Sequence, residues 1–219
     1  MLPVKRLEHA KHRLAELLAP AERRALMTAM LADVLAALGR ITAPHELLVV
    51  TADATAAGAG RDAGARVIHD TSESGHSAAA ALGIAAAAAA GAGRVLMIPG
   101  DCPLLDPESV QALLALAPEP AGRVIVVPDR AGTGTNALLL EPPAAIAPAF
   151  GPDSHQRHLL LARAAGVPAE TREIASLLLD IDTPADLSAL STALEASPGS
   201  APATERLLAR LTPAAAAAR

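Results

Sequence analysis

Aromatic residues are almost missing from this chain of 219 residues, in which Phe150 stands alone and tryptophan and tyrosine do not occur. The hydrophobic core is therefore expected to consist of Leu, Val, Ile and Ala side chains. The formal net charge is −5, and no long basic stretch occurs. Without aromatic rings to stack on bases, and without a basic stripe to follow phosphates, no binding to polymeric nucleic acid is expected. A mononucleotide needs only a few local cations and stays a candidate ligand.

Disulfide bonds and membrane segments are also not expected. Cys102 is the only cysteine, which excludes an intrachain disulfide and fits a reducing compartment. No apolar run follows Lys5 and Arg6, so the start of the chain does not resemble a signal peptide. Residues 77–93 carry no charge but are nearly all Ala and Gly, and they predict a buried helix rather than a transmembrane span. These features predict a cytoplasmic protein without a membrane partner.

Short apolar runs alternate with Ala- and Leu-rich stretches along most of the chain. Strands are predicted at 1–4, 46–50, 65–68, 94–98, 124–127, 136–140 and 177–180, and helices at 8–18, 20–39, 54–64, 76–91, 106–117, 154–166 and 184–195. This alternation predicts an α/β fold with a mostly parallel sheet and helices on both faces, formed by residues 1–195. The Ala- and Pro-rich segment 196–219 is predicted to be a tail with one loose helix near 203–211 and otherwise disordered.

Charged residues follow the predicted strands, at the edge of the sheet where ligands bind in open parallel sheets. They are Lys5, Asp53, Asp70, Asp101, Asp129, Arg130 and Asp180. A single aspartate at such a place can equally be a helix cap. The whole set together with Lys5 favours a binding site.

Three carboxylates predict a metal site. Asp101 closes a buried strand, and Asp180 and Asp182 alternate on a segment predicted to be extended, so they would face the same side. Converging carboxylates repel one another unless a cation lies between them. Oxygen ligands without a Cys or His cluster suit Mg2+, with Mn2+ as the alternative. Asp182 could also cap the helix that begins at Pro184, or do both.

Lys5, Lys11 and Arg13 surround the first strand-to-helix turn, which would offer backbone N–H groups and positive charge to phosphates. The alternative is a solvated helix face. Neither the G-x-x-x-x-G-K-[S/T] loop nor a G-x-G-x-x-G motif after a strand is present.

Two later segments can bind an anion. Residues 132–135, Gly-Thr-Gly-Thr, offer backbone and hydroxyl groups, although the same segment also predicts a hairpin turn. Ser154, just after Gly151, either caps the next helix or helps its N-terminus to hold an anion. His158, one turn further on, is expected to be exposed.

Six segments of the sequence occur in an order that resembles one known family. They are Pro3-Val-Lys-Arg-Leu7 with Lys11 and Arg13, residues 24–35, Pro99-Gly-Asp101-x-Pro103-Leu104, Asp129-Arg-x-Gly-Thr-Gly-Thr-Asn136, Phe150-Gly-Pro-x-Ser154 and Leu179-Asp-Ile-Asp-Thr-Pro-x-Asp186-Leu187. From about residue 2 to residue 190, the chain is similar to the guanylyltransferases of deazaflavin-coenzyme biosynthesis, which use 2-phospho-L-lactate or phosphoenolpyruvate. The Gly-Thr-Gly-Thr and Asp-Ile-Asp-Thr-Pro pieces are the most distinctive.

The resemblance implies a Rossmann-like nucleotidyltransferase fold of the glycosyltransferase-A type. It implies transfer of GMP from GTP to a phosphorylated three-carbon acid, with release of pyrophosphate. The residues that it implies are Asp101, Asp180 and Asp182 for Mg2+, Thr135, Gly151 and Ser154 for the acid, and Lys5, Lys11 and Arg13 for the GTP phosphates. Further nucleotide contacts are predicted at Asp53 and Gly75. The first strand is shorter than usual in the family, and residues 76–78 replace its Leu-Asn pair.

The phosphate of the acid is already ionised, so this reaction needs positioning and charge neutralisation but no general base. The heavy use of Ala and Arg suggests a GC-rich, actinobacterial genome, and for such a source the resemblance implies phosphoenolpyruvate as acceptor, with 2-phospho-L-lactate and 3-phosphoglycerate as alternatives. A related nucleotidyltransferase with another acceptor, and a non-catalytic nucleotide-binding module, are the rival predictions. A homodimer is left open.

Overall fold

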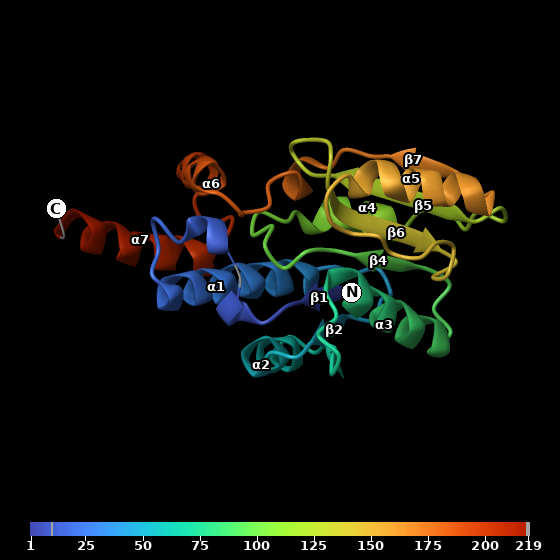
Figure 1. The fold of residues 1–219 in the computed structure, drawn as a ribbon, viewed down its shortest axis with the longest axis horizontal. Helices are drawn as coiled ribbons and strands as arrows, with labels where there is room; N and C mark the ends of the chain where they lie inside the picture. The colour runs from blue at the N-terminus through green and yellow to red at the C-terminus, as the bar shows by residue number, and fades with distance from the viewer. Residues whose placement is uncertain (10, 218–219) are drawn as a thin grey trace.

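The computed structural model describes residues 1–9 and 11–217, and within them seven strands form the centre of the fold (Figure 1). Three strands form a parallel sheet in the order β1 (Leu2–Val4), β2 (Leu48–Thr51), β3 (Arg66–His69). Four others follow in the order β4 (Val95–Met97), β6 (Thr135–Glu141), β5 (Arg123–Pro128), β7 (Ala169–Thr171). Strand β6 is antiparallel to β4 and β5, whereas β5 and β7 are parallel.

Strands β1 and β4 join these two sheets into one. The N-terminal ammonium group of Met1 donates a hydrogen bond to the carbonyl oxygen of Leu96 at 2.8 Å, and the N–H of Ile98 donates to the carbonyl oxygen of Met1 at 3.0 Å. These two bonds have the pattern of a parallel ladder. The predicted α/β fold with a mostly parallel sheet is therefore confirmed, with β6 as its antiparallel member.

Helices cover both faces of the sheet because side chains on each strand alternate between two hydrophobic cores. Val49 of β2 belongs to one core, and its neighbour Val50 belongs to the other. Helices α1 (Pro20–Leu38), α2 (Ala54–Asp62) and α4 (Pro107–Leu114) close the first core. Helices α3 (His76–Ala89) and α5 (Ser154–Ala165) close the second. Leu, Val, Ile and Ala side chains dominate both cores, as expected.

Two predicted elements are wrong. The expected helix at 8–18 is replaced by two 3₁₀ turns, η1 (Leu7–His9) and η2 (His12–Leu14), because Lys11 adopts a left-handed conformation with φ of 59°. The expected strand at 177–180 is replaced by the 3₁₀ turn η3 (Ala175–Leu177) and irregular chain. There the amide of Asn136, not a neighbouring strand, donates to the carbonyl oxygen of Leu177 at 2.7 Å. Strand β7 was not predicted.

The C-terminal segment packs against the domain. Helix α6 (Pro184–Ala196) is followed by α7 (Pro202–Ala217), which lies along α1 (Figure 1) and contains the helix predicted near 203–211. The carboxylate of Asp33 on α1 accepts hydrogen bonds from the N–H groups of Ala203 at 2.9 Å and Thr204 at 2.8 Å. Packing therefore continues past residue 195, the predicted end of the domain. Residues 218–219 of the predicted tail lie outside the described residues.

None of the helices in the described part of the chain is long and apolar enough to cross a membrane.

Candidate functional site

The site is built at the carboxyl ends of β1, β2, β3 and β4, where four loops leave the same edge of the sheet. A cavity of about 170 Å³ opens there between β1, β3 and the first turn of α3. Lys5, Asp70, Gly75 and His76 are among its lining residues. The structure therefore brings Lys5 and Gly75, two of the predicted nucleotide contacts, to one cavity.

Lys11 is the centre of the carboxylate cluster next to this cavity. Its ammonium group donates to Asp101 Oδ2 at 2.5 Å and to Asp182 Oδ1 at 2.6 Å, while its side chain is only 4% exposed. Burial opposes the charge, but the two carboxylates outweigh it and raise the pKa of Lys11 above its ordinary value. Lys11 is therefore a permanent cation between two of the three predicted metal ligands.

Asp180 lies at the side of the same cluster. The N–H of Ile181 donates to the carbonyl oxygen of Asp101 at 3.2 Å, which holds the segment against the end of β4. Asn136 donates to Asp180 Oδ1 at 3.2 Å. Burial, and then the charge of Asp101, raise the pKa of Asp180. Asp101 and Asp182 thus meet at Lys11, and Asp180 lies near enough for the charge of Asp101 to act on it, although the segment that carries Asp180 and Asp182 is not a strand.

The arrangement is not that of a finished metal site. Among the residues that the structure describes, no group of three His, Cys, Asp or Glu side chains is placed to hold a metal ion. The donor set nevertheless suits a hard cation, because it is made of carboxylate oxygens that already gather around the ammonium group of Lys11. The alternative role for Asp182 is wrong, because Thr183 caps α6 and forms a capping box with Asp186.

Asp53 has a structural role. Its Oδ1 accepts hydrogen bonds from the N–H groups of Thr55 at 2.8 Å and Ala56 at 3.0 Å, and so caps α2. Its Oδ2 accepts from the N–H of Leu7 at 3.0 Å. Both carboxylate oxygens are occupied by the backbone, so the structural alternative for this strand-end aspartate holds.

Arg13 also differs from its prediction. Its side chain is exposed and forms no ion pair within the described part of the chain, so the structure does not draw it into the carboxylate cluster. Lys5 is exposed too, but it lines the cavity.

The three residues predicted for the acid, Thr135, Gly151 and Ser154, gather around His158. Thr135 opens β6, and its Oγ1 lies 3.0 Å from His158 Nδ1. Ser154 opens α5 and lies one helical turn before His158. Gly151 has φ of 117°, which favours glycine, and its carbonyl accepts from the N–H of Ser154 at 3.1 Å.

The Gly-Thr-Gly-Thr segment forms the turn between β5 and β6, which confirms the predicted hairpin turn. A Cβ atom at Gly134 would lie 2.5 Å from Asp129 Oδ2, so a larger residue there would make the Asp129 side chain shift. The N–H of His155, near the start of α5, donates to the carbonyl of Thr133 at 3.1 Å. The first N–H groups of α5 are therefore used by the protein, and the helix N-terminus offers less to an anion than predicted.

A family comparison agrees with this geometry. The family model described as "Guanylyl transferase CofC like" matches residues 1–195. The chain belongs to this family. It is 46% identical to the phosphoenolpyruvate guanylyltransferase of Conexibacter woesei over 96% of this chain and 95% of that one. It is 40% identical to the protein of the same name from Nocardia farcinica, over 85% and 82% of the two chains.

Solved structures support the nucleotidyltransferase fold of this guanylyl transferase. A putative nucleotide-diphospho-sugar transferase from Desulfovibrio desulfuricans matches with a TM-score of 0.72 at 18% identity, over 95% of this chain and 92% of that one. A nucleotidyl transferase from Methanothermobacter matches with a TM-score of 0.64 at 18% identity, over 90% and 99%. At such identities the likeness concerns the fold alone.

The predicted exposure of His158 is wrong, because its side chain is fully buried. The N–H of Ala149 donates to its Nε2 at 2.9 Å, so Nε2 carries no proton. Burial, and then the charge of Arg157, lower its pKa to about 4, so the ring is neutral at pH 7. Nδ1 therefore carries the proton and donates to Thr135, whose own hydroxyl hydrogen stays free to be donated elsewhere.

The single aromatic residue connects the two halves of the site. The ring of Phe150 lies edge to face between those of His76, at a centroid distance of 4.7 Å, and His158, at 5.2 Å. The N–H of Phe150 also donates to Ser77 Oγ on α3 at 2.9 Å. Phe150 thus links His76 in the wall of the cavity to His158, which contacts Thr135.

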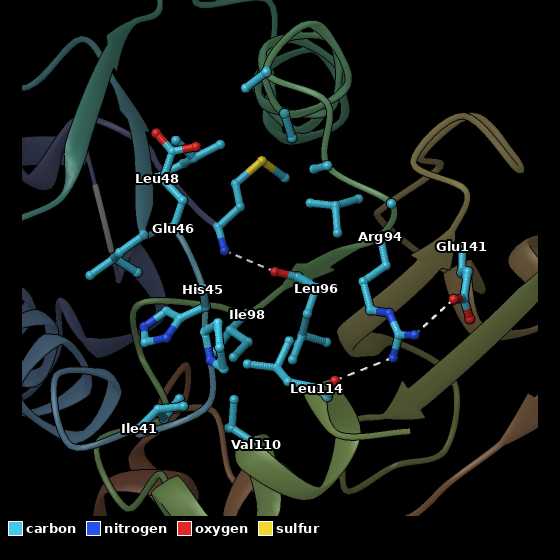
Figure 2. Close-up of a pocket in the computed structure, with 18 of the residues that line it drawn as sticks. Ile41, His45, Glu46, Leu48, Arg94, Leu96, Ile98, Val110, Leu114 and Glu141 are labelled. Carbon is cyan, nitrogen blue, oxygen red and sulfur yellow. Dashed lines mark hydrogen bonds and ion pairs between the residues drawn. The ribbon is translucent and has the colours of Figure 1, made fainter. Parts of the chain in front are cut away.

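Figure 2 shows a larger cavity, of about 720 Å³, at the amino ends of β1, β2 and β4. Arg94 in its wall donates to Glu141 at 2.8 Å and to the carbonyl of Leu114 at 3.3 Å (Figure 2). None of the residues predicted for substrate or metal lines this cavity. It lies at the opposite edge of the sheet and is not the candidate site.

Proposed function

We propose that this protein transfers the GMP group of GTP to phosphoenolpyruvate and releases pyrophosphate. Relatives that match between 85% and 96% of this chain carry the name phosphoenolpyruvate guanylyltransferase, which supports both the donor and the acceptor. The structural observation that carries the proposal is the position of Lys11 between Asp101 and Asp182, beside a cavity at the carboxyl ends of the strands. Polyphosphate chemistry needs this combination of fixed cations and carboxylates.

Mg2+ is part of the proposal, with Mn2+ as the alternative. Asp101, Asp180 and Asp182 would hold it, since their oxygens suit a hard cation. A cation bound there would stabilise the charged form of Asp180, whose pKa burial and the charge of Asp101 raise. Bound there, the ion would supply charge neutralisation at the α-phosphoryl group.

The reaction needs no protein base. An ionised phosphate oxygen of phosphoenolpyruvate attacks the α-phosphorus, a new P–O bond forms, and the bond to the bridging oxygen of the β-phosphate breaks. The electron pair leaves with pyrophosphate. Lys11 and Lys5 would stabilise this leaving group, and Lys11 suits the role because it stays charged. The role of Arg13 in the same step remains a prediction.

Thr135, Gly151 and Ser154 would bind the acid. Thr135 has a hydroxyl hydrogen to donate, because His158 fills its acceptor side. The product would enter the assembly of a deazaflavin coenzyme, as the sequence resemblance implies, in the cytoplasm, which the single cysteine favours.

The experiment is to follow pyrophosphate release from GTP and Mg2+ with each of three acids: phosphoenolpyruvate, 2-phospho-L-lactate and 3-phosphoglycerate. We expect turnover with phosphoenolpyruvate at the highest kcat/KM. Preference for another acid would correct the acceptor alone. No turnover with any of them would contradict the proposed reaction, and GTP binding without turnover would indicate a non-catalytic nucleotide-binding protein.

A further inference from the structure

Asp70 is a buried carboxylate whose two oxygens have different surroundings. It follows β3 directly and is 8% exposed. Its Oδ1 accepts three hydrogen bonds, from Ser72 N at 3.2 Å, Ser72 Oγ at 3.1 Å and Glu73 N at 3.1 Å. No described residue donates to its Oδ2, which is not one of the fully buried unpaired atoms of the described residues and is therefore accessible. One oxygen therefore fixes the loop after β3, and the other is left for a ligand.

Asp70 lines the cavity of about 170 Å³ at the carboxyl ends of the strands. Complete small-molecule pockets typically have volumes of about 300–1,000 Å³, so this cavity holds only part of a nucleotide. Pro3, Val4, Ala52 and Ala79 give it apolar walls, which suit the flat faces of a base. Lys5 also lines the cavity, and its exposed side chain could reach the phosphates of a nucleotide whose base lies inside.

Guanine has the edge that a lone carboxylate oxygen can recognise. Its N1–H and its 2-amino group are neighbouring donors, and one carboxylate oxygen has two lone pairs to accept both. Adenine has an unprotonated N1 and no 2-amino group, so it would leave the charged oxygen without a partner, which is costly in a buried place.

We propose that Asp70 selects the purine of the donor nucleotide, its Oδ2 accepting from the N1–H and 2-amino group of guanine. The inference rests on the proposed transfer from a guanine nucleotide and adds the residue that distinguishes guanine from adenine. Asp53, the strand-end aspartate that was predicted to contact the nucleotide, already accepts two backbone hydrogen bonds at Oδ1 and one at Oδ2, so it has no oxygen free to accept both guanine donors.

The first test uses the unchanged protein. ITP differs from GTP only in lacking the 2-amino group, and hydrogen bonds to a charged group contribute about 1.5–3 kcal/mol, or roughly 10- to 150-fold in affinity. Equilibrium binding of ITP should be at least about tenfold weaker than that of GTP, and ATP weaker still. Binding of ITP within twofold of GTP would overturn the inference, whether or not the protein turns over.

The second test changes the hydrogen-bonding sense of one atom. In Asp70→Asn, the three loop donors require the amide oxygen to take the place of Oδ1, so the NH₂ group must face the cavity. XTP carries an oxygen where GTP carries the 2-amino group. The ratio of kcat/KM for XTP to that for GTP should therefore rise about 100-fold or more in this variant.

The matched control is Asp53→Asn, which makes the same chemical change at the end of the neighbouring strand β2. Its XTP-to-GTP ratio should stay at the wild-type value even if its stability falls. An unchanged ratio in folded Asp70→Asn, or an equal rise in both variants, would overturn the inference. If Asp70→Asn does not fold, the ITP measurement decides. Absence of pyrophosphate release in the wild type would contradict the proposed reaction but leave the binding comparison intact.

Discussion

Lys11 combines two unusual properties, a left-handed backbone and a buried ammonium group between two carboxylates. The conformation interrupts what would otherwise be a helix, and in doing so it turns the side chain toward Asp101 and Asp182. The ammonium group occupies the centre of a cluster that would otherwise repel itself. Lys11 is thus both a structural cation and a candidate for stabilising charge on the departing phosphates.

Removing this ammonium group should make the fold depend on a metal ion. In Lys11→Met the two carboxylates lose their partner, and we expect a loss of roughly 2–3 kcal/mol in the free energy of unfolding without divalent cations. Mg2+ should then raise the melting temperature more in the variant than in the wild type. Thermal unfolding in EDTA and in Mg2+, with NaCl at matched ionic strength as the control, measures this. An equal response of both proteins would count against a metal at this cluster.

In the proposed reaction His158 would act on the acid through Thr135. An Asn side chain at 158 reaches about as far as Nδ1 and keeps a donor for Thr135, whereas Gln reaches about as far as Nε2 and keeps only an acceptor for Ala149. Loss of one neutral hydrogen bond contributes about 1 kcal/mol, so His158→Gln should raise the KM for phosphoenolpyruvate about fivefold over His158→Asn.

The KM for GTP should be the same in the two variants, and steady-state pyrophosphate release measures both constants. Equal KM values for the acid in the Asn and Gln variants would show that the imidazole only fills space.

At the scale of elements, most helices and strands could be predicted because periodicity and capping residues act locally. Asp106-Pro107, for instance, predicts the start of α4, and Asp106 accepts from the N–H groups of Glu108 and Ser109. The failures depend on distant partners. The sequence of residues 177–180 predicts a strand, but in the structure the side chain of Asn136 donates to the carbonyl oxygen of Leu177. Strand β7 was missed because its residues are all exposed, and only its pairing with β5 makes it a strand.

The same distinction holds for the site. Asp101, Asp180 and Asp182 are indicated by the sequence because motif and strand end coincide, and their binding of a metal stays a prediction. His158 and Asp70 could not be assigned, since their roles depend on which atoms of Thr135 and of the loop after β3 they meet. The one available signal for His158 was its spacing of four residues from Ser154, which places both on one face of α5.

Helix α7 is held by a carboxylate that its own sequence does not contain. Asp33 lies in α1 and accepts from the first N–H groups of α7, so it acts as a cap supplied by another helix. Asp33→Ala should lower the free energy of unfolding by about 1–2 kcal/mol. Chemical denaturation measures this, and Asp33→Asn, which keeps one acceptor oxygen, should lose less. Removing residues 197–219 should make the alanine substitution neutral; a full effect in the shortened chain would contradict this role.

At the scale of the whole molecule, the buried His158 and the half-buried His76 make stability depend on pH. Burial lowers the pKa of His158 and His76 to about 4, compared with 6.5 in the unfolded chain. Between these values the unfolded state binds more protons, so stability falls as pH drops from 6.5 toward 4. For His158 the loss approaches about 3 kcal/mol.

Urea denaturation at a series of pH values between 7 and 4.5 measures this loss. His158→Asn has no proton to gain there and should show a shallower decline than the wild type. Parallel curves for the two proteins would contradict the assignment of a neutral, buried imidazole.

The isolation of Phe150 has an optical consequence. A chain without tryptophan or tyrosine scarcely absorbs or fluoresces in the near ultraviolet, so the guanine ring of a bound nucleotide would be the main chromophore of the complex. Phe150 lies between the histidine at the cavity wall and the histidine that holds Thr135. A single Phe150→Trp substitution would therefore place a lone reporter between the two halves of the site, in a protein with almost no background signal.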